Sequence, residues 1–163
     1  MNERKLVKDH NDENNEKLIE LLKAVPVRDL ISNALKAREN SYSPYSGFAV
    51  GAALLLKSGK VILGNNIENA AYSATICAER CAFFKALSEG YTDFKAIAIV
   101  GGKQGNLIDS YAFPCGECRQ VMSEFCSGDN FVVIVAKSET DYKVYLLKEL
   151  LPEGFNLNEK EGK

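Results

Sequence analysis

The sequence predicts a single α/β domain in which helices are layered around a mixed β-sheet. The predicted helices and strands alternate along the second half of the chain, as in other α/β domains. Apart from Lys95, residues 94–100 and 131–136 are continuous apolar runs, as expected of strands that are covered on both faces. The length of 163 residues corresponds to about one domain, and the sequence contains no evident internal repeat.

Two helices are expected near the amino terminus. Residues 1–15 are charged and rich in asparagine, with too little apolar surface to offset the entropy lost on ordering. Apolar residues at helical spacing predict a short helix over residues 18–25, which Pro26 should end. The same spacing predicts a second helix over residues 27–40.

A loop and a hairpin are expected next. Residues 40–47 are rich in turn-forming types and predict a loop. Residues 48–56 and 60–67 are apolar and rich in β-formers, and Lys57-Ser58-Gly59 between them predicts a hairpin turn.

The rest of the chain alternates helices with strands. The expected elements are a helix over residues 77–89 closed by Gly90, a strand over 94–100, a loop over 101–112, a helix over 115–125, strands over 131–136 and 143–146, and a helical turn over 148–151.

Composition excludes several classes of function. The net charge of −2 provides no basic surface for a nucleic acid polymer or an anionic membrane. No apolar run approaches the roughly 20 residues that cross a bilayer, and the amino end has no signal-peptide core. We therefore expect a cytoplasmic protein. In that reducing setting, five cysteines indicate metal or redox chemistry rather than disulfides.

Three cysteines and one glutamate have the spacing of a catalytic zinc site. Cys77, Cys115 and Cys118 supply three ligands, the number that leaves a fourth position for water. Glu79 lies two residues after the first ligand, where a carboxylate can transfer protons. The only histidine, His10, lies in the polar amino-terminal segment, so a general acid or base must be another residue type.

Other roles for these residues remain open at this stage. The three cysteines could form a structural zinc knuckle or be buried thiols, and a Cys-x-x-Cys pair alone also fits redox chemistry. Cys81 could be a fourth ligand, although core packing suits Cys81 and Cys126 better. Glu117 lies between two ligands and competes with Glu79 for proton transfer, but side chains at such a position tend to point away from the metal.

Five segments resemble the cytidine deaminases, specifically the small homotetrameric type with three cysteine ligands. The resemblance covers the chain from about Asp29 to Phe155. The segments are Tyr42-Ser-Pro-Tyr-Ser-Gly-Phe48-Ala-Val-Gly-Ala, Asn66-Ile-Glu68-Asn-Ala-Ala-Tyr72, Cys77-Ala-Glu-Arg80, Pro114-Cys-Gly-Glu-Cys-Arg-Gln120 and Leu150-Leu-Pro-Glu-Gly-Phe155.

The resemblance implies a fold and a reaction. It implies a three-layer α/β/α fold with a mixed five-stranded sheet, formed by a catalytic domain over residues 26–156. Residues 1–25 would be an amino-terminal extension, partly disordered or a short helix, and residues 157–163 a tail. One Zn²⁺ per subunit would support the deamination of cytidine and deoxycytidine in pyrimidine salvage. The partners would be a free pyrimidine nucleoside and further copies of the chain, with no nucleic acid polymer and no membrane.

The resemblance also assigns residue roles. Cys77, Cys115 and Cys118 would bind zinc, Glu79 would be the general acid and base, and Arg80 would hydrogen-bond the ligand thiolates, although a plain surface arginine is the alternative. The residues that it implies for substrate binding are Phe48 and the Ala78 backbone N–H for the base, Asn66 and Glu68 for the ribose, and Tyr72 and Phe155 across a subunit interface. Without the resemblance, Phe48 would be assigned to the core, and Asn66 and Glu68 to ordinary polarity at a strand end.

The chain departs from the family pattern at Gly47, Ala71, Phe113 and Glu117. Of these, Phe113 and Glu117 could alter the pocket rim or the subunit contacts. Two other functions compete with nucleoside deamination: deamination of a different base, an antibiotic analogue or a base within RNA or DNA, and a binding module whose zinc is structural.

Overall fold

The computed structural model describes residues 12–156, which fold around a five-stranded mixed sheet with strand order β2-β1-β3-β4-β5. The strands are β1 (Phe48–Leu56), β2 (Val61–Asn65), β3 (Phe94–Lys103), β4 (Val132–Ser138) and β5 (Asp141–Leu146). The pair β3–β4 is parallel, and the other neighbouring pairs are antiparallel. This arrangement confirms the predicted mixed sheet.

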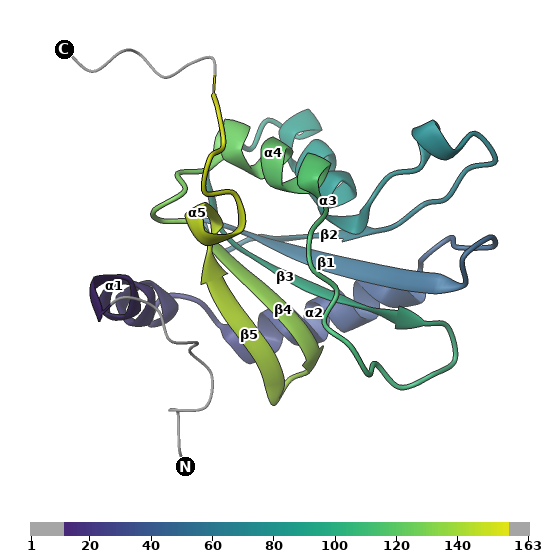
Figure 1. Ribbon diagram of the computed structural model, residues 1–163, viewed down its shortest axis with the longest axis horizontal. Coiled ribbons are helices and arrows are strands. Elements are labelled where there is room, and N and C mark those ends of the chain that lie inside the picture. The colour runs from purple at the N-terminus through teal and green to yellow at the C-terminus, as the bar shows by residue number, and fades with distance from the viewer. Residues whose placement is uncertain (1–11, 157–163) are drawn as a thin grey trace.

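Helices cover both faces of the sheet and give three layers (Figure 1). The helices are α1 (Asp12–Leu22), α2 (Val27–Glu39), a short 3₁₀ turn η2 (Tyr72–Ala74), α3 (Ala78–Ser88), α4 (Gly116–Phe125) and α5 (Leu147–Leu150). Successive side chains of a strand point to opposite faces, so Ile97 and Ile99 pack with α3 and α4, whereas Ala96 and Ala98 pack with α2. Burial on both faces explains the continuous apolar run in β3.

Several element boundaries differ from those expected, and in two elements, α1 and β3, the difference is three residues or more. Helix α1 begins at Asp12 and ends at Leu22, and residues 23–25 form tight turns with hydrogen bonds to the third preceding residue. Val25 precedes a proline, which disfavours the helical backbone at that position. The fully buried Leu18 nevertheless packs α1 against the α2 face of the sheet.

Strand β3 extends to Lys103, whereas a loop was expected from Gly101. Pairing with β1 explains the extension, since Val50 lies opposite Gly101 and Phe48 opposite Lys103. Long-range pairing here outweighs the low strand propensity of two glycines.

His10 and the tail over residues 157–163 lie outside the described residues. No helix in the described part of the chain is long and apolar enough to span a membrane.

The topology brings the carboxyl ends of β2 and β3 to one end of the sheet. The start of β1 lies there too, because Gly51 pairs with Asn65 and Phe48 with Lys103. The chain that leaves β2 returns at the amino end of α3, and the chain that leaves β3 returns at the amino end of α4. Both cysteine motifs therefore belong to connections that leave the same end of the sheet.

Gly64 sets the distance between β2 and the first turns of α3. A Cβ atom at this position would lie 2.3 Å from the carbonyl oxygen of Ala78 and 2.5 Å from the backbone nitrogen of Ala82. Contacts of this length with backbone atoms require the helix to move. The missing side chain therefore allows α3 to lie directly against β2.

We predict that Gly64→Ala destabilises the protein, because the added methyl group would push α3 away from β2. Overpacking of this kind costs about 1–3 kcal/mol. Urea unfolding measures the loss in the free energy of unfolding. Gly116→Ala is the matched control, since a Cβ there meets no atom within 4 Å. Equal losses in the two variants would show that the close approach of α3 at Gly64 is not the cause.

Candidate metal centre and substrate cavity

The three predicted zinc ligands lie together although 38 residues separate the first two in sequence. Cys77 directly precedes α3, Cys115 directly precedes α4, and Cys118 lies in the first turn of α4. Their Sγ atoms all lie within 4.8 Å of one another, and those of Cys77 and Cys115 are 3.9 Å apart. Tetrahedral zinc with Zn–S bonds of about 2.3 Å requires sulfur atoms about 3.8 Å apart. The cluster therefore fits one zinc ion.

The chemistry of the donor set also fits a zinc ion. Hydrogen bonds from the Cys118 thiol and the Arg80 guanidinium lower the pKa of Cys77 to about 5. The same hydrogen bond with Cys77, together with burial, raises the pKa of Cys118. Backbone N–H groups at the two helix amino ends further favour thiolates. Within the described residues, Cys81 is not part of this cluster, so three protein ligands leave one coordination position for water.

Glu79 lies in the first turn of α3 and is 4% exposed. Burial raises the pKa of its carboxyl group to about 7. A group with this pKa can both accept and release a proton near neutral pH. Glu79 also lines a cavity that Cys77 and Cys115 border, whereas the side chain of Glu117 is 74% exposed and lies outside the lining of that cavity. The geometry supports Glu79 as the proton-transfer group.

Arg80 contacts the predicted zinc ligands. Its Nη2 lies 3.6 Å from the Cys77 Sγ and 3.5 Å from the carbonyl oxygen of Thr75. Although burial opposes it, hydrogen bonds to the Cys77 and Cys118 sulfur atoms raise the pKa of Arg80. This guanidinium therefore remains charged beside the thiolates and balances part of their negative charge.

A cavity of about 360 Å³ opens beside the cysteines, within the range of small-molecule sites. Its walls are mostly apolar, with polar groups at the Glu79 and the Asn66–Glu68 positions. The lining residues are Phe48, Val50, Asn66, Glu68, Thr75, Ile76, Cys77, Ala78, Glu79, Ile99, Ala112, Phe113 and Cys115. Six of the predicted site residues outside the α4 motif thus face one cavity. Those six are Phe48, Asn66, Glu68, Cys77, Ala78 and Glu79.

Asn66 has a structural role as well as a place in the cavity wall. Its Oδ1 accepts hydrogen bonds from the Ser41 hydroxyl at 2.5 Å and the Val50 N–H at 2.8 Å, and its Nδ2 donates to the Phe48 carbonyl at 2.9 Å. An amide nitrogen has two hydrogens, so one donor remains for a ligand. This network also fixes the start of β1, where Phe48 lies.

Glu68 is oriented by the loop that precedes β1. Its Oε2 accepts hydrogen bonds from the N–H groups of Tyr45 at 2.8 Å and Ser46 at 3.2 Å. Hydrogen bonds from Ser46 and from the Tyr45 backbone lower the pKa of Glu68, so it is a carboxylate at neutral pH. A fixed carboxylate at the cavity edge can accept hydrogen bonds from hydroxyl groups.

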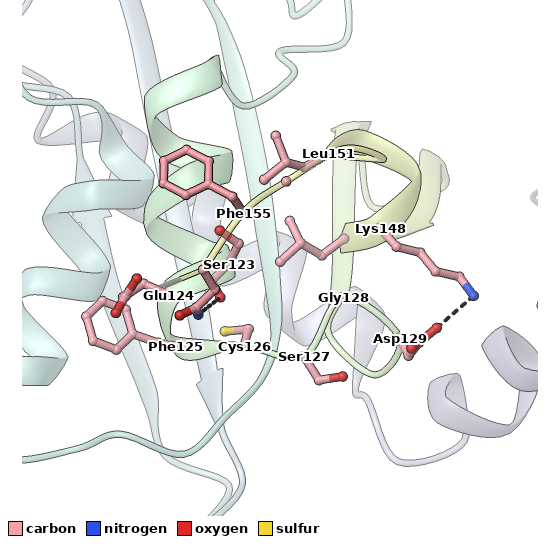
Figure 2. A pocket seen from close by; sticks show the side chains of 13 residues that line it. Ser123, Glu124, Phe125, Cys126, Ser127, Gly128, Asp129, Lys148, Leu151 and Phe155 are labelled. Carbon is pink, nitrogen blue, oxygen red and sulfur yellow. Dashed lines mark hydrogen bonds and ion pairs between the residues drawn. The ribbon is translucent and has the colours of Figure 1, made fainter. Parts of the chain in front are cut away.

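Two of the predicted substrate contacts do not line this cavity. Phe155 is 67% exposed and borders a separate hollow of about 490 Å³ beside the carboxyl end of α4 (Figure 2). Tyr72 is 78% exposed and packs edge-to-face against Tyr45, with ring centroids 6.3 Å apart. Tyr72 borders a third hollow, which shares Glu68 with the substrate cavity. Within one chain, neither aromatic ring completes the site.

Some residues of the site carried no signal in the sequence. Ser41 supports Asn66 from an ordinary turn sequence, and Ala112 reaches the cavity from a long loop. Gly101 leaves room for the Phe48 ring, since a Cβ there would lie 3.0 Å from a ring carbon of Phe48 and 2.7 Å from the Ala112 methyl group. Phe113 lines the cavity and packs against Tyr145 at 5.6 Å, so this departure from the family pattern shapes the rim.

Comparison with known proteins agrees with this geometry. The family model "Cytidine and deoxycytidylate deaminase zinc-binding region" matches residues 26–135. The cytidine deaminase of Sporosarcina psychrophila is 48% identical over 130 residues, which cover 80% of this chain and 91% of that protein. The cytidine deaminase of Halalkalibacterium halodurans is 50% identical over 126 residues, which cover 77% and 91%.

A solved structure agrees with the fold as well. The crystal structure of cytidine deaminase from Burkholderia pseudomallei matches with a TM-score of 0.70 and 45% sequence identity, covering 78% of this chain and 97% of that one. Because the family match spans more than half of this sequence and the relatives match over most of their own length, the chain belongs to the zinc-binding cytidine deaminase family.

Proposed function

We propose that Glu79, the three-cysteine zinc site and the adjoining cavity together carry out the hydrolytic deamination of cytidine and deoxycytidine. The products are uridine or deoxyuridine and ammonia. One observation carries this proposal: a buried carboxyl group with a pKa of about 7 faces the same apolar cavity as two of three clustered thiols. The chain is a cytidine deaminase, and free pyrimidine nucleosides are its substrates.

Zinc would be held by Cys77, Cys115 and Cys118. When bound there, zinc supplies Lewis-acid activation of a water molecule near neutral pH. Arg80 donates hydrogen bonds to the sulfur atoms and offsets their charge, which keeps the site from becoming strongly negative.

Glu79 moves the protons of the reaction. Its carboxylate accepts a proton from the attacking water and passes it to ring nitrogen 3 of cytosine. Oxygen then adds to carbon 4, and the carbon becomes tetrahedral. Glu79 next transfers the second water proton to the amine, and the carbon–nitrogen bond breaks to release ammonia. A pKa near 7 suits both directions of transfer.

The other cavity residues orient the nucleoside. Phe48 packs on the pyrimidine, and the free N–H of Ala78 in the first turn of α3 donates to the carbonyl oxygen of the base. The remaining Asn66 donor and the Glu68 carboxylate bind the ribose hydroxyls. Sugar recognition at this edge favours a free nucleoside over a base within a polymer, because a polymer would need space beyond the ribose.

Residues from neighbouring copies complete the site in this proposal. Phe155 and Tyr72 are exposed and lie outside the cavity of their own chain, which supports roles at a neighbour's cavity. The working unit is then a homo-oligomer, and we propose a homotetramer. None of the five cysteines of the chain forms a disulfide, which supports a reducing, cytoplasmic setting.

An ammonia-release assay tests the function directly. Cytidine and deoxycytidine should release ammonia, and prior removal of zinc by a chelator should abolish the release. Adenosine, cytosine base and a cytosine-containing DNA oligonucleotide serve as comparison substrates. One zinc per subunit without turnover of either nucleoside would instead indicate a binding module.

Glu79→Gln should abolish most activity and leave the zinc content unchanged. The amide keeps the shape of the side chain but cannot carry protons, so kcat should fall by about 10²- to 10⁴-fold. Steady-state kinetics and metal analysis of the same preparation measure both quantities. Near-normal turnover in this variant would remove Glu79 from the mechanism.

Phe155→Ala should raise KM for cytidine about tenfold, because stacking of an aromatic ring on a base contributes about 1–3 kcal/mol. Subunit mixing tests whether the ring acts in a neighbour. Phe155→Ala subunits have Glu79 but no ring, and Glu79→Gln subunits have the ring but no proton carrier. Mixed and reassembled, the two should show a population of sites with normal KM. Mixtures that only average the two parents would contradict a shared site.

A further inference from the structure

We propose that Glu117 is a positioning residue for the zinc site, and that it acts by holding the Arg80 guanidinium against the Cys77 sulfur. The proposal rests on the zinc-binding role of the three cysteines. It gives a function to the residue between the two ligands of α4, which the reaction described above does not use.

The geometry joins the two helices that carry the zinc ligands. Arg80 lies on α3 and Glu117 on α4, and Nη1 of Arg80 is 3.0 Å from Oε2 of Glu117. The other terminal nitrogen, Nη2, faces the Cys77 Sγ at 3.6 Å. Because a guanidinium is planar and rigid, holding one terminal nitrogen fixes the direction of the other.

Arg80 has few other contacts that could hold it in place. Its Nε is buried and has no hydrogen-bond partner in the part of the chain that the structure describes. Its Nη2 contacts with Thr75 and Cys77 are long, at 3.5 and 3.6 Å. At 3.0 Å, the ion pair with Glu117 is shorter than either of these contacts. Without Glu117, the head group would be held only by weak contacts with the Thr75 carbonyl and the Cys77 and Cys118 sulfur atoms, and it could turn away from them.

The exposure of the two side chains indicates that Glu117 acts mainly by positioning the Arg80 guanidinium, rather than by adding negative charge near the metal. The Arg80 side chain is 18% exposed, whereas that of Glu117 is 74% exposed. Water and salt screen the field of an exposed carboxylate at the metal, but a direct hydrogen bond still directs the guanidinium. The position between two ligands suits this role, because the side chain of Glu117 points away from the cavity and toward α3.

The test measures zinc release, not only activity. The zinc-loaded protein is mixed with an excess of a chromophoric chelator, and the rate of release is followed by absorbance. Glu117→Ala should release zinc about two- to fivefold faster than the wild type, the range expected for an ion pair with one exposed partner. KM for cytidine should not change, since Glu117 does not line the cavity.

Three further variants separate a positioning role from a purely electrostatic one. Glu117→Gln keeps an oxygen that accepts from Nη1, so it should restore most of the wild-type release rate. In an Arg80→Ala background, Glu117→Ala should not change the rate of zinc release further, because the guanidinium that Glu117 holds is absent. Glu139→Ala removes an exposed acid in the turn between β4 and β5 and should release zinc at the wild-type rate.

The outcomes are distinct. Equal effects of Glu117→Ala with and without Arg80, or a Glu117→Gln variant as fast as Glu117→Ala, would overturn the positioning role while leaving the zinc site intact. A wild-type protein that binds no zinc would overturn the proposed function as well. Coupling between Glu117 and Arg80 together with rescue by glutamine would establish the role.

Discussion

The meeting of two helix amino ends over one edge of the sheet determines most of this site. Helices α3 and α4 both follow strands whose carboxyl ends lie at that edge, and each begins directly after a cysteine. The absence of a side chain at Gly64 lets the first turns of α3 lie directly against β2. The sulfur positions, the direction of Glu79 and the N–H of Ala78 are therefore consequences of the backbone rather than of flexible side chains.

Burial gives opposite properties to the two glutamates that follow or separate the cysteines. Glu79 is 4% exposed and lies against an apolar cavity, so the charged form is disfavoured and its pKa rises to about 7. The Glu117 side chain is 74% exposed and pairs with Arg80. Both glutamates lie in the first turn of a helix. Burial suits Glu79 to the proposed transfer of protons, whereas exposure leaves Glu117 charged and able to hold Arg80.

Sequence reasoning could predict the parts of this site that depend on local spacing. Cys77, Glu79 and the Cys115–Cys118 pair begin helices, and a helix start fixes side-chain directions within a few residues. Contacts between distant segments carried no such signal. The extension of β3 through Gly101 depends on pairing with β1, and the Arg80–Glu117 ion pair depends on how α3 and α4 pack. A sequence pattern shows neither, because both are set by tertiary structure.

The exposed aromatic residues distinguish two parts of the proposed site. The three-cysteine cluster, Glu79 and the cavity wall that carries Phe48 all lie within one copy, and all of them rest on the sheet or on helix starts. Tyr72 and Phe155 instead come from a 3₁₀ turn and from the segment after α5, and both side chains are largely exposed. Burying two exposed aromatic rings against another copy would release water from apolar surface, so association and completion of the site would have the same driving force. In the proposed oligomer, the chemistry is placed on the rigid core, whereas closure around the substrate depends on assembly.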